Sequence, residues 1–329
     1  MLKNGIKETI FLEKVKRETT RVGFGEGLLL AGEKNRQVVA LSADLSESTQ
    51  VEKFKTRFPE NYIEVGVAEQ NLIGVAAGLA HLGKIPFAAS YAIFSPGRTW
   101  EQIRTTICYN NQNVKIVGSH GGLTVGADGA THQALEDIAL MRVLPNMTVL
   151  SPCDYLEARR LTYLAAQWIG PTYIRLSREK SPLITNLDTG CQIGKAEIFW
   201  SPENKKQAVV AILATGPIIF KALIAAKELL KEGIEVEVIN FSTIKPLDEA
   251  TLLRIGKEIG RVVTLEDHQK MGGFGSAVSE FYSQVMPIPM EILGVNDQFG
   301  QTGSGEELLE YYGLGAKDVI AAAKRILNR

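Results

Sequence analysis

The segment from residue 118 to residue 133 carries side chains that could bind hydroxyl groups and move protons. It reads G-S-H-G-G-L-T-V-G-A-D-G-A-T-H-Q and includes His120, Asp128 and His132, so it holds two of the four histidines of the chain. Imidazole groups transfer protons near neutral pH, and imidazole and carboxylate groups both form hydrogen bonds with hydroxyls. The glycines let the backbone approach a ligand closely because they have no Cβ. The segment therefore predicts a polar binding loop.

The elements that must position this loop are a strand before it and a helix after it. Residues 113–117 read N-V-K-I-V, which is typical of a strand, and residues 134–141 read A-L-E-D-I-A-L-M, which is typical of a helix. The same alternation continues along the chain and favours parallel sheets covered by helices. The sequence predicts an α/β fold with two doubly wound parallel-sheet domains, residues 1–190 and 207–329, joined by a linker at 191–206 that includes an edge element.

Periodicity predicts the remaining elements of both domains. Further strands are expected at 37–41, 86–89, 148–150, 172–176, 208–216, 236–240, 261–265 and 290–293. Further helices are expected at 21–31, 68–82, 98–109, 156–168, 218–232, 249–259, 274–285 and 319–327. Residues 298–305 are expected to form an exposed loop.

Bulk properties exclude several classes of protein. A net charge of −1 and a pI near 6.5 give no electrostatic reason to bind nucleic acid or an acidic membrane. Cys108, Cys153 and Cys191 lack C-x-x-C spacing, which argues against a disulfide framework and a zinc site. The chain has no signal-like apolar start and no apolar run long enough to span a bilayer. We expect a soluble cytoplasmic protein without a nucleic-acid or membrane partner.

A second informative segment, residues 62–80, has Glu69 at the head of an apolar helix that contains glycine. An acid in the first turn of a helix is favoured by the helix dipole alone, which is a purely structural explanation. In an apolar site, the same carboxylate could form a hydrogen bond with a ring nitrogen of an aminopyrimidine and serve as a proton relay. On these residues alone both explanations stay open.

Two motifs together resemble the transketolase family of thiamine-diphosphate enzymes. The loop matches the pattern H-x-x-x-x-x-G-x-D-G-x-T-H-Q, and the other segment reads G-V-A-E-Q-N followed by G-x-x-x-G-L-A. The resemblance implies that Glu69 is catalytic and binds the cofactor pyrimidine, and that the loop binds a sugar. It also implies that His132 is catalytic and contacts the C1 hydroxyl or carbonyl oxygen of the donor sugar, while Asp128 forms a hydrogen bond with a hydroxyl of that sugar.

The resemblance extends to other cofactor positions. Tyr91 and Phe94 take the places of two aromatic residues that cover the pyrimidine ring, if one residue is inserted before Arg98. Asp44 and Leu45 lie in the sequence S-A-D-L-S-E-S, which resembles a family segment at the cofactor. A turn or capping role is the alternative explanation for Asp44.

Four residues match family positions that bind the sugar phosphate, namely Arg21, Ser48, His120 and Arg178. Arginine suits such a site because its planar guanidinium forms paired, charge-assisted hydrogen bonds with phosphate oxygens. A single arginine is usually a solvated surface residue, but these four matches occur in the family order. Arg98 is a further candidate charge near the site, with a structural role equally open.

The resemblance covers only two of the three domains of a transketolase, the pyrimidine-binding domain (1–190) and the C-terminal domain (207–329). The family segment G-D-G followed by N-N, which holds Mg²⁺ and the diphosphate, has no match in this sequence. We therefore expect a separate N-terminal subunit to bind Mg²⁺ and the diphosphate of the shared cofactor, with no metal ligand on this chain. Two copies of each subunit would form a heterotetramer, and this chain alone would be inactive.

The activity that the resemblance implies is transfer of a two-carbon ketol unit from a ketose phosphate to an aldose phosphate, as in the pentose phosphate pathway. Other functions remain open. 1-Deoxyxylulose-5-phosphate synthases share the G-A-D-G-x-T-H-Q core but are single long chains, and β subunits of 2-oxoacid dehydrogenases usually lack the two-histidine loop. A non-catalytic scaffold is a third alternative, although it would not need these polar residues.

The second domain offers one weaker motif. Residues 265–268 read L-E-D-H and are followed by G-G-F-G-S at 272–276. Glycines at a helix start could bind an anion, but we expect them to form a tight connection between strand and helix. We expect His268 to be structural.

Overall fold

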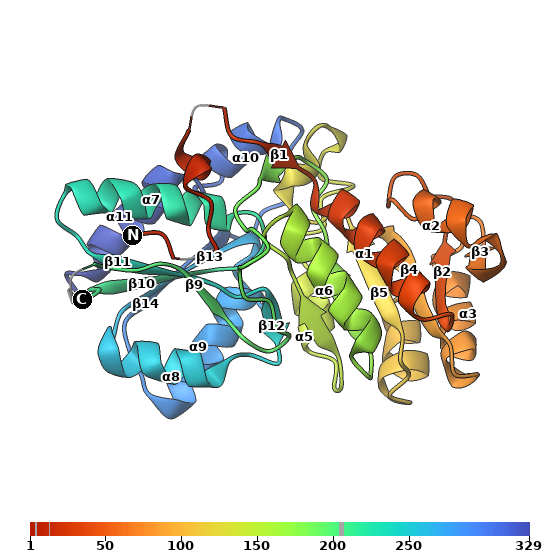
Figure 1. Cartoon of the computed structure of the whole chain (residues 1–329). Helices are drawn as coiled ribbons and strands as arrows, with labels where there is room; N and C mark the ends of the chain where they lie inside the picture. Colours follow the sequence, from red (N-terminus) through yellow and green to blue (C-terminus); the bar gives the residue numbers. More distant parts are fainter. Residues whose placement is uncertain (4, 13, 204–206) are drawn as a thin grey trace.

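The computed structural model describes residues 1–3, 5–12, 14–203 and 207–329, and it places two α/β domains side by side (Figure 1). The strands of the first sheet are β2 (Val38–Ser42), β3 (Tyr62–Glu64), β4 (Ile85–Tyr91), β5 (Lys115–Ser119), β6 (Thr148–Leu150), β7 (Thr172–Arg175) and β12 (Thr243–Lys245). Their order across the sheet is β12-β6-β7-β5-β4-β2-β3. Every neighbouring pair is parallel except β12 and β6.

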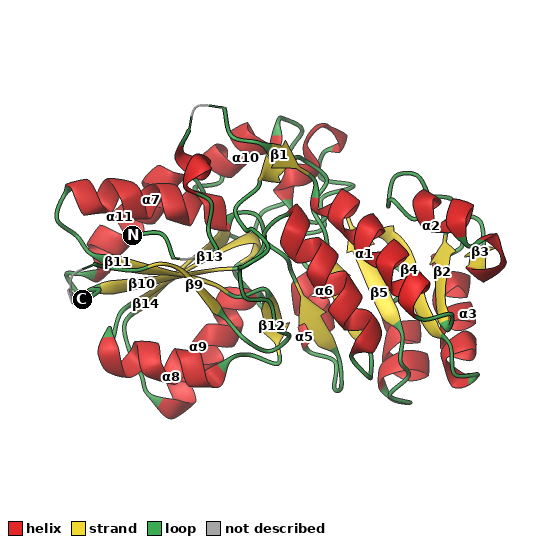
Figure 2. Cartoon of the chain, viewed as in Figure 1, coloured by secondary structure: helices red, strands yellow, loops and turns green. Residues whose placement is uncertain are grey.

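Helices cover both faces of this sheet (Figure 2). They are α1 (Thr20–Lys34), α2 (Glu52–Arg57), α3 (Glu69–His81), α4 (Trp100–Gln102), α5 (Asp137–Arg142) and α6 (Tyr155–Gln167). Successive strand residues point to opposite faces, so Val38 and Ala40 pack in one apolar cluster while Val39 and Leu41 pack in another. Burial on both faces explains why these strands read as nearly continuous apolar runs.

The second sheet repeats this architecture on a smaller scale. Its strands are β9 (Glu197–Trp200), β10 (Val210–Ala214), β11 (Val236–Asn240), β13 (Val262–Gln269) and β14 (Met290–Val295). Their order is β14-β13-β10-β11-β9, and only β9 is antiparallel to its neighbour. Its helices are α7 (Ile219–Lys231), α8 (Glu249–Glu258), α9 (Phe274–Val285), α10 (Gly305–Tyr311) and α11 (Ala316–Ile326). Helices α7 and α11 lie on one face and α8 and α9 on the other (Figure 1).

Short elements complete the fold. Strands β1 (Arg17–Glu18) and β8 (Ser181–Pro182) form a two-stranded antiparallel ribbon. Short 3₁₀ helices lie at Glu8–Phe11, Pro59–Asn61 and Leu123–Asp128, and a π-helical turn follows α4 at Ile103–Cys108.

The predicted α/β class with two largely parallel sheets is confirmed. The edge element expected within 191–206 is β9, and the last three residues of that predicted linker, 204–206, lie outside the described residues. The helix predicted at 98–109 is confirmed over residues 100–108, where the short helix α4 continues directly into the π-helical turn. Strand β12 comes from the second half of the chain but joins the first sheet, and its three residues are too few to show a period.

Burial governs the chemistry of the cysteines. Cys108 and Cys153 are buried, and all three cysteines are free thiols. Burial raises the pKa of Cys108 to about 12 and that of Cys153 well above its usual value, so both stay protonated at neutral pH. Within the described parts of the chain, no helix is both long and apolar enough to cross a membrane.

Candidate active site

The residues singled out by their sequence pattern meet at the carboxyl edge of the seven-stranded sheet. Strand β2 is followed by Asp44 and Leu45, β4 ends at Tyr91, β5 leads to His120, and β7 leads to Arg178. Glu69 begins α3, and Arg21 is the second residue of α1. Parallel strands deliver their carboxyl-end loops to one edge, which is where open α/β sheets bind ligands.

Glu69 is the buried carboxylate of this edge. Its side chain is 5% exposed, and it forms an ion pair with the guanidinium of Arg98, with a nitrogen 3.3 Å from Oε2 and 3.5 Å from Oε1. Arg98 is 56% exposed, and its guanidinium carbon lies 4.3 Å from the centre of the Phe94 ring. A charged pair and an aromatic face are thereby assembled at one point. The sequence suggested Arg98 as an additional charge near the site but did not indicate its contact with Glu69, which is 29 residues away.

An aromatic cluster adjoins this carboxylate. The rings of Tyr91 and Phe94 are nearly parallel, with 16° between their planes and 5.8 Å between their centres. Tyr91 stacks on His120 at 3.8 Å, and His132 meets the edges of Tyr91 and Phe94 at 6.4 and 5.6 Å. The loop at 118–133 thus brings both of its histidines to the two aromatic residues, as their shared sheet edge requires.

The two histidines differ in environment. His120 is buried, has a positive φ of 60°, and shares a hydrogen bond of 2.9 Å between Nδ1 and the Ser119 hydroxyl. Burial, with the nearby charges of Arg21 and Arg178, lowers the pKa of His120 to about 3, so its ring is neutral at pH 7. His132 is half-buried and thus more accessible than His120, and its Nδ1 lies 3.0 Å from the Thr131 hydroxyl. His132 is therefore the ring that can reach a bound molecule.

The two predicted phosphate arginines lie next to each other. The Arg21 guanidinium donates to the carbonyl oxygens of Ser48 (2.6 Å) and Arg178 (3.3 Å), while its Nε is buried without a hydrogen-bond partner. Arg178 donates to the Val125 carbonyl at 2.6 Å and forms an ion pair with Asp128 at 3.3 Å. Burial lowers the pKa of Arg21. Tyr91 opposes this effect, and the positive charge of Arg178 adds to it. Two close cations with an unsatisfied N–H group favour an anionic ligand.

Asp44 and Leu45 lie in the neighbouring turn, and their backbone N–H groups donate hydrogen bonds within the protein. The Asp44 N–H donates to Glu64 Oε1 at 2.7 Å, and the Leu45 N–H donates to the Ser42 hydroxyl at 3.0 Å. Glu64 also accepts from the Gly66 N–H at 2.9 Å, so one carboxylate joins the Asp44 turn to the segment before α3. Sequence reasoning missed this role of Glu64 because its partners come from two separate loops.

A second layer holds the histidine loop from below. Asp267 of β13 accepts hydrogen bonds from the Leu123 N–H at 2.8 Å and the Thr124 hydroxyl at 3.1 Å. The buried ion pair of Arg175 with Asp137, at 2.9 Å, lies beneath the same loop, and Arg175 also donates to the Asp267 carbonyl at 2.8 Å. The second domain therefore fixes the position of the loop, which no local pattern could have indicated.

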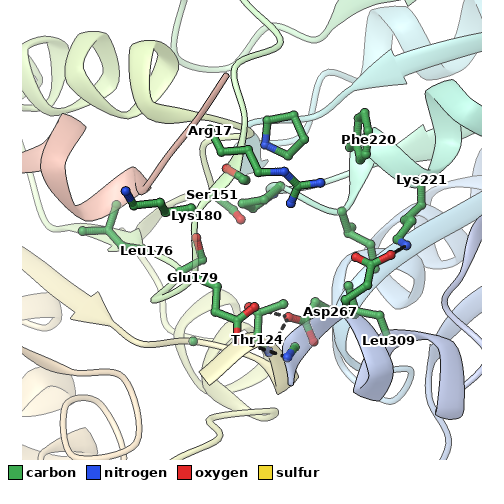
Figure 3. Close-up of a pocket in the computed structure, with 18 of the residues that line it drawn as sticks. Arg17, Thr124, Ser151, Leu176, Glu179, Lys180, Phe220, Lys221, Asp267 and Leu309 are labelled. Atoms are coloured by element: carbon green, nitrogen blue, oxygen red, sulfur yellow. Dashed lines mark hydrogen bonds and ion pairs between the residues drawn. The ribbon is translucent and has the colours of Figure 1, made fainter. Parts of the chain in front are cut away.

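A separate cavity of about 100 Å³ lies between the domains, on the side of the loop that faces Asp267 (Figure 3). Thr124 and Asp267 line it from one side, and the Arg17 guanidinium points into it from the other. None of the site residues predicted from the sequence lines this cavity. It is thus distinct from the cluster of Glu69, aromatic residues and histidines.

The side chains at the sheet edge suit a planar heteroaromatic ring. A buried carboxylate beside half-buried aromatic faces supplies a hydrogen bond in the plane of such a ring and stacking above it. Within the described residues, no group of three or more His, Cys, Asp and Glu side chains is arranged to hold a metal ion.

Comparisons with known proteins agree with this geometry. Two family models match, the transketolase pyrimidine-binding domain over residues 16–182 and the transketolase C-terminal domain over residues 201–319. A protein of Methanocaldococcus jannaschii named as a transketolase C-terminal section is 44% identical over 311 residues, which are 94% of this chain and 95% of that protein. A 6-deoxy-6-sulfo-D-fructose transketolase subunit of Clostridium sp. is 39% identical over 319 residues, 97% of this chain and 98% of that protein.

The same relation is seen among solved structures. One described as a split gene transketolase, inactive beta4 tetramer, has a TM-score of 0.87 and 45% identity, and the match covers 94% of this chain and 98% of that one. These matches extend over both domains and over nearly the whole of each related chain. The chain therefore belongs to the transketolase family and consists of its pyrimidine-binding and C-terminal domains.

Proposed function

We propose that this chain is one subunit of a split, thiamine-diphosphate-dependent transketolase. It would transfer a two-carbon ketol unit from a ketose phosphate to an aldose phosphate, together with a separate subunit that binds the diphosphate and Mg²⁺. The observation that carries the proposal is the buried Glu69 carboxylate beside Phe94 and Tyr91, next to a loop whose polar side chains suit a sugar.

Three residues would hold the pyrimidine ring of the cofactor. Thiamine diphosphate, when bound, supplies the carbon nucleophile for breaking and forming carbon–carbon bonds. The Glu69 carboxylate would share a proton with the ring nitrogen, and burial keeps water from competing for that bond. Phe94 and Tyr91 would fix the plane of the ring by stacking. Asp44 and Leu45 would approach the cofactor from the turn after β2.

The loop and the arginines would bind the sugar phosphate. His132 is half-buried beside both aromatic rings, so it could donate a proton or hydrogen bond to the donor oxygen at the reacting end. Asp128 would accept a hydrogen bond from a donor hydroxyl. The phosphate would lie at the other end of the sugar, against the residues that bring positive charge or hydrogen bonds: Arg21, Ser48, His120 and Arg178.

The finer assignment of assembly and substrate rests on related proteins. The related structure is described as a split gene transketolase in the form of an inactive beta4 tetramer. We infer that this chain likewise needs an N-terminal partner and forms a heterotetramer with two copies of each subunit. Another relative is named for a sulfonated sugar, so the donor is either a pentose phosphate pathway sugar or a related specialised ketose. We place the enzyme in the cytoplasm, with the domain boundary within 191–206.

The test is a ketol-transfer assay with xylulose 5-phosphate and ribose 5-phosphate, in the presence of thiamine diphosphate and Mg²⁺. We expect activity from the mixture of this chain with the cognate diphosphate-binding subunit, none from either alone, and none from the mixture with Glu69→Ala. Activity of this chain alone would contradict the partner requirement. A complex that binds no thiamine diphosphate would contradict the proposed function and favour a scaffold.

A further inference from the structure

The contacts of Arg98 are those that a bound aminopyrimidine would need. Its guanidinium donates toward both oxygens of Glu69, at 3.3 and 3.5 Å, and it lies over the Phe94 ring at 4.3 Å. A guanidinium is planar, carries N–H donors at its edge and stacks on aromatic faces. A protonated aminopyrimidine has the same three properties. The guanidinium and the ring would therefore compete for one carboxylate and one aromatic face.

Burial explains why an arginine occupies this position. A carboxylate as buried as that of Glu69 is unfavourable when it is left without a partner. Arg98 gives it an opposite charge while no ring is present. More than half of the Arg98 side chain is exposed, so its charged end can move to water without rearranging the core.

The backbone also allows the guanidinium to move while the aromatic face stays in place. The Arg98 N–H donates to the Phe94 carbonyl at 2.8 Å, which fixes the start of the side chain at the rim of the ring. Phe94 itself is held in the cluster with Tyr91 and His132. Only the flexible stem of Arg98 has to change its rotamers.

We propose that Arg98 occupies the aminopyrimidine position in the cofactor-free subunit and is displaced when thiamine diphosphate binds. This inference rests on the proposed function, because it takes Glu69 and Phe94 as the cofactor contacts. Arg98 then lowers the apparent affinity for the cofactor, since only the fraction of molecules with the guanidinium displaced can bind it. It also keeps the isolated subunit from exposing an unpaired carboxylate.

The experiment is a titration of the reconstituted two-subunit complex with thiamine diphosphate at fixed Mg²⁺, followed by tryptophan fluorescence and circular dichroism. Arg98→Gln keeps most of the side-chain length but removes the charge, and we expect it to tighten cofactor binding about fivefold. Arg98→Lys keeps the charge but lacks the planar edge, so its affinity for thiamine diphosphate should lie between those of the wild type and Arg98→Gln. Arg104, which is exposed and lies nearby in the chain, supplies the matched control Arg104→Gln, which should leave the affinity unchanged.

A second comparison links the effect to the carboxylate. In the background of Glu69→Gln, the substitution Arg98→Gln should no longer tighten binding, because the neutral amide does not hold the guanidinium. Unchanged or weaker binding by Arg98→Gln in the wild-type background, with a normal circular dichroism spectrum, would overturn the proposal while leaving the proposed function intact. Failure of the wild-type complex to bind thiamine diphosphate at all would overturn both.

Discussion

Both sheets of the chain carry polar residues at their carboxyl edges, but these residues differ in exposure and in hydrogen bonding. At the first sheet, His132 is half-buried, much of Arg98 is exposed, and the buried Arg21 Nε has no hydrogen-bond partner. At the second sheet, Glu266, Asp267 and His268 near the end of β13 are buried and form hydrogen bonds within the protein. The same architecture thus supports a candidate ligand site in one domain and a structural network in the other.

Glu266 illustrates the second case. Its carboxylate accepts hydrogen bonds from the Phe274 N–H at 2.6 Å and the Gly275 N–H at 2.8 Å, so it caps the start of α9. A Cβ on Gly273 would lie 2.1 Å from a Glu266 oxygen, which explains the glycine. Burial raises the pKa of Glu266 to about 7 although these hydrogen bonds oppose it. The anion at this helix start is the protein's own, and the expected tight connection is confirmed.

His268 follows the same rule. It is buried, its Nδ1 lies 2.8 Å from the Gln269 carbonyl oxygen, and its Nε2 accepts a hydrogen bond from the Ala139 N–H at 3.4 Å. Both ring nitrogens are occupied within the protein, as expected of a structural histidine. The two edges therefore differ in whether their polar groups already have hydrogen-bond partners within the protein, and not in residue type.

The largest expected effect comes from exchanging carboxylate for amide at each edge. Glu69→Gln should lower the ketol-transfer rate on the order of a thousandfold, because the proton shared with the ring nitrogen is lost. It should change the free energy of unfolding by only about 1 kcal/mol, since its ion pair with Arg98 is partly solvated. Glu266→Gln should lower that free energy by about 2 kcal/mol, because an amide NH₂ would face a backbone donor.

Denaturant unfolding and steady-state kinetics of both variants would test this contrast. If Glu266→Gln lowered the rate as much as Glu69→Gln without loss of stability, the division between the two edges would be wrong. The control is Glu228→Gln in the exposed part of α7, where its ion pair with Lys231 is at the surface.

A smaller effect is expected from replacing two aspartates, Asp128 within the loop at 118–133 and Asp267, which accepts a hydrogen bond from this loop. Asp128→Ala should raise the KM for the donor about tenfold and weaken discrimination between donor epimers, because one hydrogen bond to a hydroxyl is lost. Asp267→Ala should instead lower the free energy of unfolding by about 2 kcal/mol, since the Leu123 N–H would be left buried without a partner. Equal kinetics of Asp128→Ala and the wild type across donor epimers would refute the role of Asp128.

Local patterns in the sequence predicted much of this molecule. The loop at 118–133 and the segment at Glu69 are contiguous, so their residue types and spacing could be matched directly. The contacts of Glu64 with Asp44 and of Arg98 with Glu69 could not be predicted, because these partners are 20 and 29 residues apart. Helix α2 and strands β3 and β12 were missed, since three to six residues do not define a period.

The smallest expected effect is a difference in acid sensitivity. His120 has a folded pKa of about 3 and an unfolded pKa near 6.5, so the unfolded chain binds more protons between these values and stability falls as the pH drops below 6.5. Replacing His120 by Asn should remove this contribution. Between pH 7.5 and 5.5, the free energy of unfolding of the variant should therefore fall by about 1 kcal/mol less than that of the wild type. The exposed His81 gives the control His81→Asn, which should follow the wild type.

Adding inorganic phosphate to the same measurement tests whether the arginines beside His120 bind an anion. If the arginines beside His120 bind phosphate, the added anion should oppose their effect on the His120 ring, raise its pKa and reduce the acid sensitivity of the wild type. The variant His120→Asn should show a smaller phosphate effect on the pH dependence. His268 has a pKa lowered to about 4 by burial at the second edge. The nearby Arg175 is buried in its ion pair with Asp137, so phosphate should leave the contribution of His268 unchanged. An identical response of His120→Asn and His268→Asn to phosphate would show that the two edges do not differ in this respect.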